Sequence, residues 1–117
     1  MEEFIYIANE NLNRAYEIID ELNITKVWAD SQCTANLVGS IKTKLLMSNL
    51  DIDFHVYSKS FSIQDSFQAI SRIANNYRIK KISCFNFIED KDKSLDWHLH
   101  YFDKDNRKWR IDIIQTS

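Results

Sequence analysis

Gly39 is the only glycine among the 117 residues of this chain. An average protein of this length would contain about eight. The other turns are therefore built without the residue that most easily adopts left-handed backbone conformations. Gly39 follows the apolar stretch 33–38 and directly precedes Ser40. We expect it to occupy a backbone position that a side chain would obstruct.

The composition is that of a single globular domain covering residues 1–117. Hydrophobic residues make up 44% of the chain, which argues against disorder. The formal charge of −2 is too balanced for general binding to nucleic acid or an anionic membrane, so we expect neither partner. The N-terminus lacks a signal-peptide pattern, and no apolar run approaches the roughly 20 residues of a membrane span. Two cysteines form no disulfide framework, so we expect a cytoplasmic protein.

Hydrophobic periodicity predicts two main helices. The first covers residues 9–23, with Asn9 or Asn11 as its N-cap. The second covers residues 62–77 and begins at Ser62, with an aspartate three positions later that resembles a capping box. Its apolar stripe is predicted to consist of Ile63, Phe67, Ile70, Ala74 and Tyr77.

Runs of β-branched and aromatic residues predict the strands. These runs are 33–38, 51–57, 79–87, 95–102 and 108–114, of which the last two form a hairpin. We expect a short strand or its approach at 26–30, and a short helical turn at 41–49. The predicted fold class is α+β, with a mixed, largely antiparallel sheet of about five strands and two main helices packed on it.

Tryptophan and cysteine residues in these elements are assigned to the core. The predicted core side chains are Trp28, Trp97, Leu99, Tyr101 and Trp109. Cys33 and Cys84 are predicted to be inert buried thiols.

Two aspartates, Asp51 and Asp53, open the strand 51–57. Residues i and i+2 of a strand point to the same face, about 6.5 to 7 Å apart. Two neighbouring carboxylates repel each other and favour a cation between them, and oxygen ligands suit Mg²⁺ or Mn²⁺ better than zinc. Alone, such a pair is more often two solvated acids on an edge strand.

The Gly39–Ser40 pair precedes these acids. A strand that ends in Gly-Ser can turn sharply and bring backbone N–H groups and a hydroxyl close to a phosphate. A short basic turn containing Lys42 and Lys44 separates the pair from Asp51. Order and spacing together are more specific than either motif alone.

This arrangement resembles the nucleotidyltransferase fold superfamily. Its hallmark is a hydrophobic strand, Gly-Ser, a short helical turn and Asp-x-Asp on the next strand. The family also has a third carboxylate flanked by hydrophobic residues on a later strand, and Asp112 in "KWRIDII" matches it. The resemblance covers roughly residues 26–114 and is greatest to a little-characterised bacterial branch.

The resemblance implies transfer of a nucleoside monophosphate from an NTP, with ATP expected, to an unidentified acceptor hydroxyl. Pyrophosphate would be released. Asp51, Asp53 and Asp112 would hold the Mg²⁺ or Mn²⁺ ions, and Asp112 could also orient or deprotonate the acceptor hydroxyl. Gly39 and Ser40 would cradle the β- and γ-phosphates.

Some positions depart from the family pattern and leave alternatives open. Lys42 would supply the charge that relatives place directly after Gly-Ser, and Lys44 stands where many relatives have a second glycine. The chain ends five residues after Asp112, where most relatives continue into further helices. The alternatives are a domain that needs a helical partner protein or a second copy, and a non-catalytic nucleotide- or protein-binding module on the same fold.

Histidines offer a further set of candidates. His98 and His100 share one strand face, which makes them candidate substrate contacts if their strand borders the acidic one. His55 shares its face with Asp51 and Asp53. Zinc binding by the three histidines is the less favoured hypothesis, because their spacing matches no zinc pattern.

Overall fold

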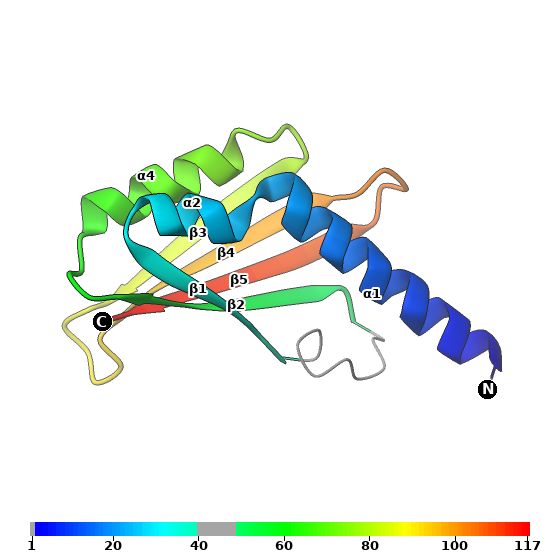
Figure 1. Cartoon of the computed structure of the whole chain (residues 1–117), viewed down its shortest axis with the longest axis horizontal. Coiled ribbons are helices and arrows are strands. Elements are labelled where there is room, and N and C mark those ends of the chain that lie inside the picture. The colour runs from blue at the N-terminus through cyan, green and yellow to red at the C-terminus, as the bar shows by residue number, and fades with distance from the viewer. Residues whose placement is uncertain (1, 40–48) are drawn as a thin grey trace.

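The computed structural model describes residues 2–39 and 49–117 as a five-stranded sheet with three described helices (Figure 1). The elements are α1 (Glu2–Leu22), α2 (Ile24–Asp30), β1 (Cys33–Val38), β2 (Asp51–Ser58), α4 (Ile63–Ala74), β3 (Ile79–Phe87), β4 (Ser94–Phe102) and β5 (Lys108–Thr116). No helix in the described ranges is both long and apolar enough to cross a membrane.

The sheet has the strand order β1-β2-β5-β4-β3. β2 and β5 are parallel, whereas the other three neighbouring pairs are antiparallel. The C-terminal strand therefore lies in the middle of the sheet, between β2 and β4. The predicted α+β class with a mixed, largely antiparallel sheet is confirmed.

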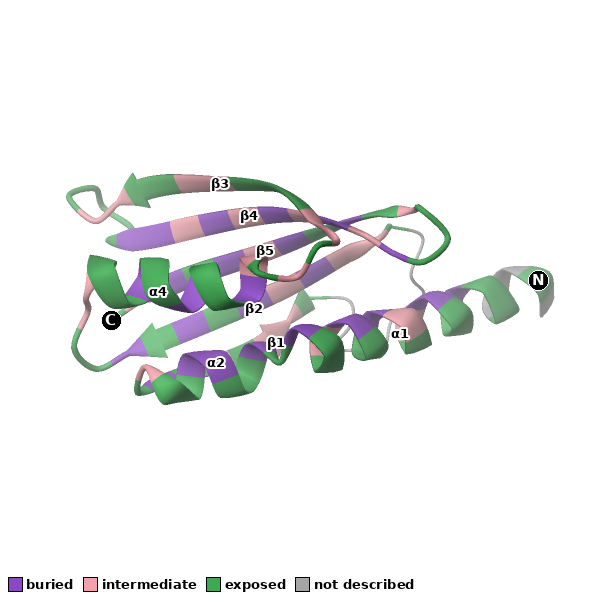
Figure 2. Cartoon of the chain, turned by 90° about the horizontal axis from the view of Figure 1, so that it is seen from above, coloured by how far each residue is buried: buried purple, intermediate pink, exposed green. Residues whose placement is uncertain are grey.

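One face of the sheet is apolar and carries all the described helices (Figure 2). Strands β4 and β5 alternate between buried and more exposed residues, as expected where one face is covered. The buried side chains include Leu95, Trp97, Leu99, Tyr101, Trp109, Ile111 and Ile113. The predicted core tryptophans are confirmed, since Trp28, Trp97 and Trp109 are each at most 2% exposed.

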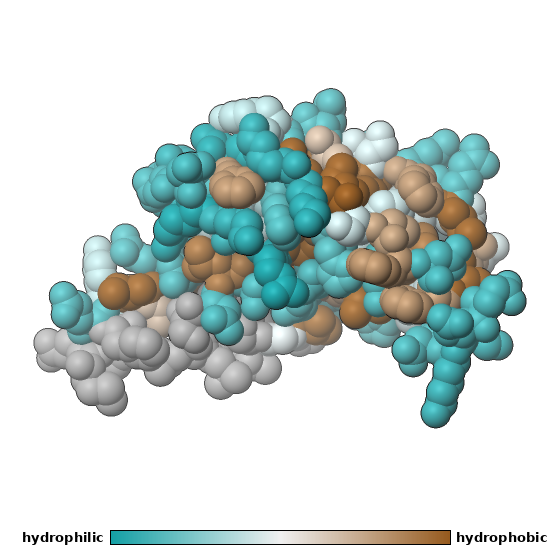
Figure 3. Space-filling model, turned by 180° about the vertical axis from the view of Figure 1, so that it is seen from behind, coloured by the Kyte–Doolittle hydropathy of each residue, from teal (hydrophilic) through white to brown (hydrophobic). Residues whose placement is uncertain are grey.

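The opposite face, which we call the open face, has no described helix over it. Asp51, Asp53, His98 and Asp112 lie at the strand positions that alternate with the buried residues, so they belong to this face. Seen from this side, hydrophilic side chains gather over the middle of the molecule (Figure 3). The candidate site is therefore built on the open face.

Two predictions for the N-terminal region are wrong. The first helix begins at Glu2, so neither Asn9 nor Asn11 caps it. Asn11 is instead buried and accepts a hydrogen bond from Arg107 in the β4–β5 loop at 3.0 Å. The stretch 26–30 is helical, as part of α2, whose buried residues follow helical spacing. So short an apolar run does not distinguish the two periodicities.

The predicted start of helix α4 is correct, but the prediction of which of its residues are buried is partly wrong. The Ser62 hydroxyl accepts a hydrogen bond from the Asp65 backbone N–H at 3.2 Å, which confirms the cap. The buried residues are Ser66, Ala69, Ile70 and Ile73, whereas Ile63, Phe67 and Tyr77 are exposed. The Ser66 hydroxyl accepts a hydrogen bond from the Trp97 indole at 2.9 Å. This buried polar contact accounts for a serine on the covered side.

The two cysteines differ from each other. Cys33 is buried, as predicted, with its Sγ 3.1 Å from the Ser58 hydroxyl. Cys84 is only half-buried on the edge strand β3, so its assignment as a buried thiol is wrong. Burial and the nearby Asp96 charge nevertheless raise the pKa of the Cys84 thiol.

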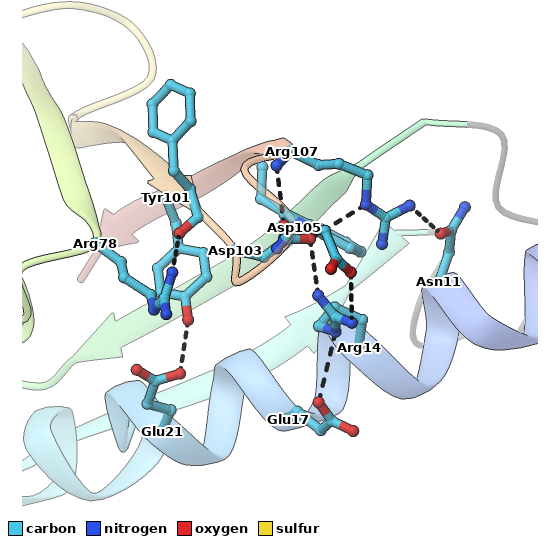
Figure 4. A network of polar contacts seen from close by, with 11 residues as sticks. Asn11, Arg14, Glu17, Glu21, Arg78, Tyr101, Asp103, Asp105 and Arg107 are labelled. Carbon is cyan, nitrogen blue, oxygen red and sulfur yellow. Dashed lines mark hydrogen bonds and ion pairs between the residues drawn. The ribbon is translucent and has the colours of Figure 1, made fainter.

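A buried polar network joins α1 to the β4–β5 loop (Figure 4). Asp103, 2% exposed, lies 3.1 Å from the Arg14 guanidinium and accepts a hydrogen bond from the Trp109 indole at 2.9 Å. Arg107 also donates to Asp103, at 3.3 Å. The long first helix is thus fixed against the sheet by charge-assisted hydrogen bonds as well as by its apolar face.

Candidate functional site

Strand register brings three polar side chains into one line across the open face. Asp53 of β2 is directly opposite Asp112 of β5, which is in turn directly opposite His98 of β4. We call these three residues the carboxylate row. They come from separate parts of the chain, and the placement of β5 between β2 and β4 makes them neighbours.

Asp51 and Arg110 lie next to this row. They are opposite each other on β2 and β5, two residues before Asp53 and Asp112 and therefore on the same face. Arg110 Nη2 is 3.4 Å from Asp112 Oδ2. Arg110 was not among the site residues predicted from the sequence, although its i, i+2 spacing from Asp112 is present in "KWRIDII".

The environment of Asp53 disfavours the charged form of its carboxyl group. Burial raises its pKa above the usual range, and the charges of Asp112 and Asp51 raise it further. A hydrogen bond with Asp112 acts in the same direction, and Arg110 partly opposes the shift. Asp53 and Asp112 therefore form a pair of adjacent carboxyl groups. Their oxygens are a donor set that suits a hard divalent cation.

His98 contacts Asp112 directly. His98 Nδ1 is 2.7 Å from Asp112 Oδ1, and the Phe85 ring and the imidazole meet edge to face, with centroids 5.8 Å apart and planes at 71°. The two contacts fix the orientation of the imidazole beside the third carboxylate. The substrate contact predicted for His98 stays a prediction, and strand pairing also gives this residue a protein partner.

His100 occupies a different position. It lies opposite Arg110 and Lys81, in the line that also contains Asp51. Burial and the neighbouring Lys108, Lys81 and Arg110 charges lower its pKa. His55 shares a hydrogen bond with Thr116 at 3.0 Å, and it lies on β2, which β5 separates from the β4 strand of the other two histidines.

Gly39 lies against Asp53. Its φ is +79°, in the left-handed region that favours glycine, and a Cβ on it would be 2.8 Å from Asp53 Oδ2. A side chain here would therefore be strained and would collide with the carboxylate. Ser40, Lys42 and Lys44, like most of the predicted helical turn at 41–49, lie outside the described residues.

An open hollow of about 410 Å³ adjoins Asp51. It is lined by Asn49, Leu50, Asp51, Lys108 and Arg110. Two cations and one carboxylate therefore line a space next to the carboxylate row. Within residues 2–39 and 49–117, no three His, Cys, Asp or Glu side chains are grouped closely enough to form a metal site as they stand.

Comparisons with solved structures identify similar folds. The poly(A) polymerase GLD-2, in complex with GLD-3, matches 97% of this chain with a TM-score of 0.67 and 11% identity. A cytoplasmic RNA terminal U-transferase matches 99% of it with a TM-score of 0.60 and 16% identity. The Cid1 poly(U) polymerase, solved with Mg and 3′-dATP bound, matches 98% with a TM-score of 0.59 and 16% identity.

This chain is much shorter than these enzymes, since it covers 37% of the length of each. No protein-family model and no curated protein sequence matches it. At such low identity the likeness establishes the fold alone. The chain has the nucleotidyltransferase fold that these polymerases share.

Proposed function

We propose that this chain is a metal-dependent nucleotidyltransferase that moves a nucleoside monophosphate from an NTP to an acceptor hydroxyl. The observation that carries the proposal is the pairing of Asp53 with Asp112 on adjacent parallel strands, with Gly39 packed against Asp53. We treat residues 1–117 as one domain that contains the whole carboxylate set. Its two cysteines are free, in keeping with a reducing compartment, and we place the reaction in the cytoplasm.

Asp51, Asp53 and Asp112 are the proposed ligands for Mg²⁺ or Mn²⁺. When bound, such ions neutralise phosphate oxygens and stabilise an in-line displacement. The donor set fits this role, because a cation would offset both the burial and the neighbouring Asp112 and Asp51 charges that raise the pKa of Asp53. Oxygen-only ligation is the chemistry that both ions prefer.

In the transfer step, the acceptor oxygen forms a bond to the α-phosphorus of the NTP. The bond from this phosphorus to the bridging oxygen breaks, and pyrophosphate leaves with the electron pair. Asp112, with its carboxylate oriented by His98 and Arg110, would receive the acceptor proton. Positioning and charge neutralisation would then supply most of the catalysis.

The triphosphate would lie on the side of the row where Gly39 and Asp51 are found. Gly39 is exposed there and has no side chain that would obstruct a phosphate, and Ser40 is the proposed hydroxyl partner of the β- and γ-phosphates. Lys42 and Lys44 are proposed as further phosphate contacts. The hollow beside Asp51 supports this placement.

The structural neighbours support an NTP as donor, with ATP as our first candidate. Cid1 was solved with Mg and 3′-dATP, and the GLD-2 enzyme is a poly(A) polymerase that assembles with GLD-3. We propose by analogy with the GLD-2 complexes that the chain acts together with a helical partner protein or a second copy. The neighbours act on RNA, but the net charge of −2 offers no general electrostatic attraction for a nucleic-acid acceptor.

The test is thermal unfolding with each NTP, with and without Mg²⁺ or Mn²⁺. A ligand at 100 times its Kd should add about 2.7 kcal/mol to the stability of the wild-type protein. Asp53→Asn should abolish the metal-dependent part of this gain. Asp96→Asn, on the same face but outside the row, is the matched control and should retain it. No stabilisation by any nucleotide would overturn the proposal and favour a binding module for another ligand.

A further inference from the structure

Side chains on the open face lie in parallel rows, because every second residue of each strand points the same way. On one side of the carboxylate row is the basic row, formed by Lys81, His100 and Arg110, with Asp51 at its β2 end. On the other side is a row that we call the apolar row. It consists of His55, Ile114, Asp96 and Phe85, on β2, β5, β4 and β3. The acids therefore separate two chemically different surfaces.

Two of the four residues in the apolar row, Phe85 and Ile114, expose large hydrophobic side chains, and the other two are His55 and Asp96. Phe85 is 53% exposed and Ile114 is 40% exposed. The Phe85 ring stacks on Phe87 of the next row, with centroids 6.2 Å apart and planes within 10°. Tyr57, also in that next row, is 50% exposed. Single exposed hydrophobic residues are ordinary, but a group of them beside a candidate reaction centre is a candidate binding surface.

Charge distinguishes the apolar row from the basic row. The apolar row contains no lysine or arginine. The next row also contains none, and it consists of Tyr57, Thr116, Ser94 and Phe87. The acid of the apolar row is Asp96, whose Oδ1 accepts a hydrogen bond from the Ser94 hydroxyl at 2.8 Å. No lysine or arginine in these two rows offsets the Asp96 charge. This carboxylate therefore repels a phosphate group but does not repel an uncharged ligand. Figure 3 shows brown and tan hydrophobic side chains, interspersed with teal ones, on the right of this face.

We propose that the apolar row binds the acceptor, and that the acceptor is a small uncharged molecule with a planar ring near its reactive hydroxyl. This inference rests on the proposed function, which identifies the neighbouring carboxylates as the reaction centre. Phe85 touches His98, and His98 touches Asp112. Phe85 on β3 lies one row along and two strands across from Asp112 on β5, roughly 11–12 Å at the backbone, and His98 on β4 connects the two through its side chain.

The charge asymmetry also gives the substrates a direction. The donor phosphates would lie on the basic side of the acids, and the acceptor ring would lie on the apolar side. The terminal nucleoside of a nucleic acid also carries a planar ring, but its phosphate chain would have to cross the row that contains Asp96. A small neutral acceptor avoids this repulsion.

The experiment uses simple probes in the absence of metal and nucleotide. Phenyl β-glucoside supplies a planar uncharged ring with hydroxyl groups. Cyclohexyl β-glucoside has a non-planar ring, and phenyl phosphate has the same ring with a negative charge. Binding is followed by NMR of the protein labelled with ¹³C in its phenylalanine rings, and an oligoadenylate is titrated in parallel.

We expect phenyl β-glucoside to shift the Phe85 and Phe87 signals and to bind at least about five-fold more tightly than the other two small probes, since stacking on an aromatic ring is worth this much. Phe85→Ala should weaken its binding about five-fold or more. Phe85→Leu keeps an apolar side chain and should weaken it similarly without disturbing the fold. Ile82→Ala is the matched control, because Ile82 is 46% exposed on the same strand but on the opposite face, and it should change nothing.

Three results would overturn the inference. They are an absence of shifts at Phe85 with phenyl β-glucoside, binding that Phe85→Leu leaves unchanged, and tighter, salt-dependent binding of the oligoadenylate at the same phenylalanines. Failure of the proposed function would look different. In that case phenyl β-glucoside would bind, but Mg²⁺ and ATP together would not stabilise the protein. If ATP stabilises the protein and the neutral ring does not bind, the acceptor inference alone fails.

Discussion

At the scale of the residue, Gly39 makes the most specific prediction. Gly39→Ala should destabilise the protein by roughly 1–3 kcal/mol, because φ is +79° and the added Cβ would lie 2.8 Å from Asp53 Oδ2. Urea unfolding measures this loss. Asn36→Ala, at an exposed position of β1, is the control and should change stability by no more than about 0.5 kcal/mol. A Gly39→Ala variant as stable as the wild type would contradict this account of the single glycine.

His98 is expected to act through Asp112. Removing its imidazole in His98→Ala should weaken Mn²⁺ binding about 10-fold or more, because Asp112 would lose a 2.7 Å contact that orients it. Electron paramagnetic resonance of free Mn²⁺ gives the affinity directly. His100→Ala, two residues along the same strand face, should alter the affinity much less. Equal effects of the two variants would indicate a general charge effect instead of orientation.

Asp53 predicts a pH dependence of stability in the absence of metal. Its folded-state pKa is raised, so the native protein holds this proton more tightly than the unfolded chain does. Stability should therefore fall as pH rises from about 4, the ordinary value for aspartate, through the raised folded-state value. Asp53→Asn should remove this part of the decline in urea unfolding followed from pH 4 to 7. An unchanged profile would show that the carboxyl group is not strained.

At the scale of the element, strands were easier to predict from sequence than helices. Alternation of apolar and polar residues in 95–102 and 108–114 depends on one covered face, which the sheet provides. The buried face of α4 is rotated by about one residue from the predicted apolar stripe: Ser66 and Ala69 are buried, and Phe67 is exposed. The burial of Ser66 depends on a hydrogen bond from Trp97, 31 residues away. No local pattern contains that information.

The attachment of α1 predicts an acid-sensitive contact. Burial alone would raise the pKa of Asp103, but hydrogen bonds from Arg107, Trp109 and Asp105, with the Arg107 charge, lower it on balance. Its stabilising effect is therefore present above about pH 4 and is lost as pH falls through the lowered value. Asp103→Asn should cost about 3 kcal/mol at pH 7, because Arg14 and Arg107 both lose the charge of a carboxylate whose side chain is 1% exposed.

The matched control for this contact is Asp105→Asn. Asp105 pairs with the same Arg14, but its side chain is 60% exposed, so the loss should be about 1 kcal/mol or less. Urea unfolding at pH 7 and pH 3 compares the two variants. A loss for Asp103→Asn that is no larger than that for Asp105→Asn would show that burial adds nothing to this attachment.

At the scale of the whole molecule, the sheet separates stability from the proposed chemistry. The helices and the apolar core occupy one face, and the candidate site occupies the other (Figures 2 and 3). Spacing in the sequence predicted Asp51 and Asp53 as a pair, and the resemblance to nucleotidyltransferases implied Asp112 as the third carboxylate. Spacing could not predict that His98 meets Asp112, because this depends on β5 lying between β2 and β4 and on the register of both pairs. Nor could it reveal the division of the open face into basic and apolar rows.

The central claim is that a divalent cation and an NTP bind at the carboxylate row. The most direct measurement is paramagnetic broadening of backbone NMR signals by substoichiometric Mn²⁺ in the presence of ATP. We predict that the strongest broadening is at Asp53, Asp112 and His98, with little at Asp30 on the helix-covered side, and that Asp53→Asn removes it. Broadening concentrated instead in the charged loop at residues 89–92, or unchanged in Asp53→Asn, would contradict the proposed site.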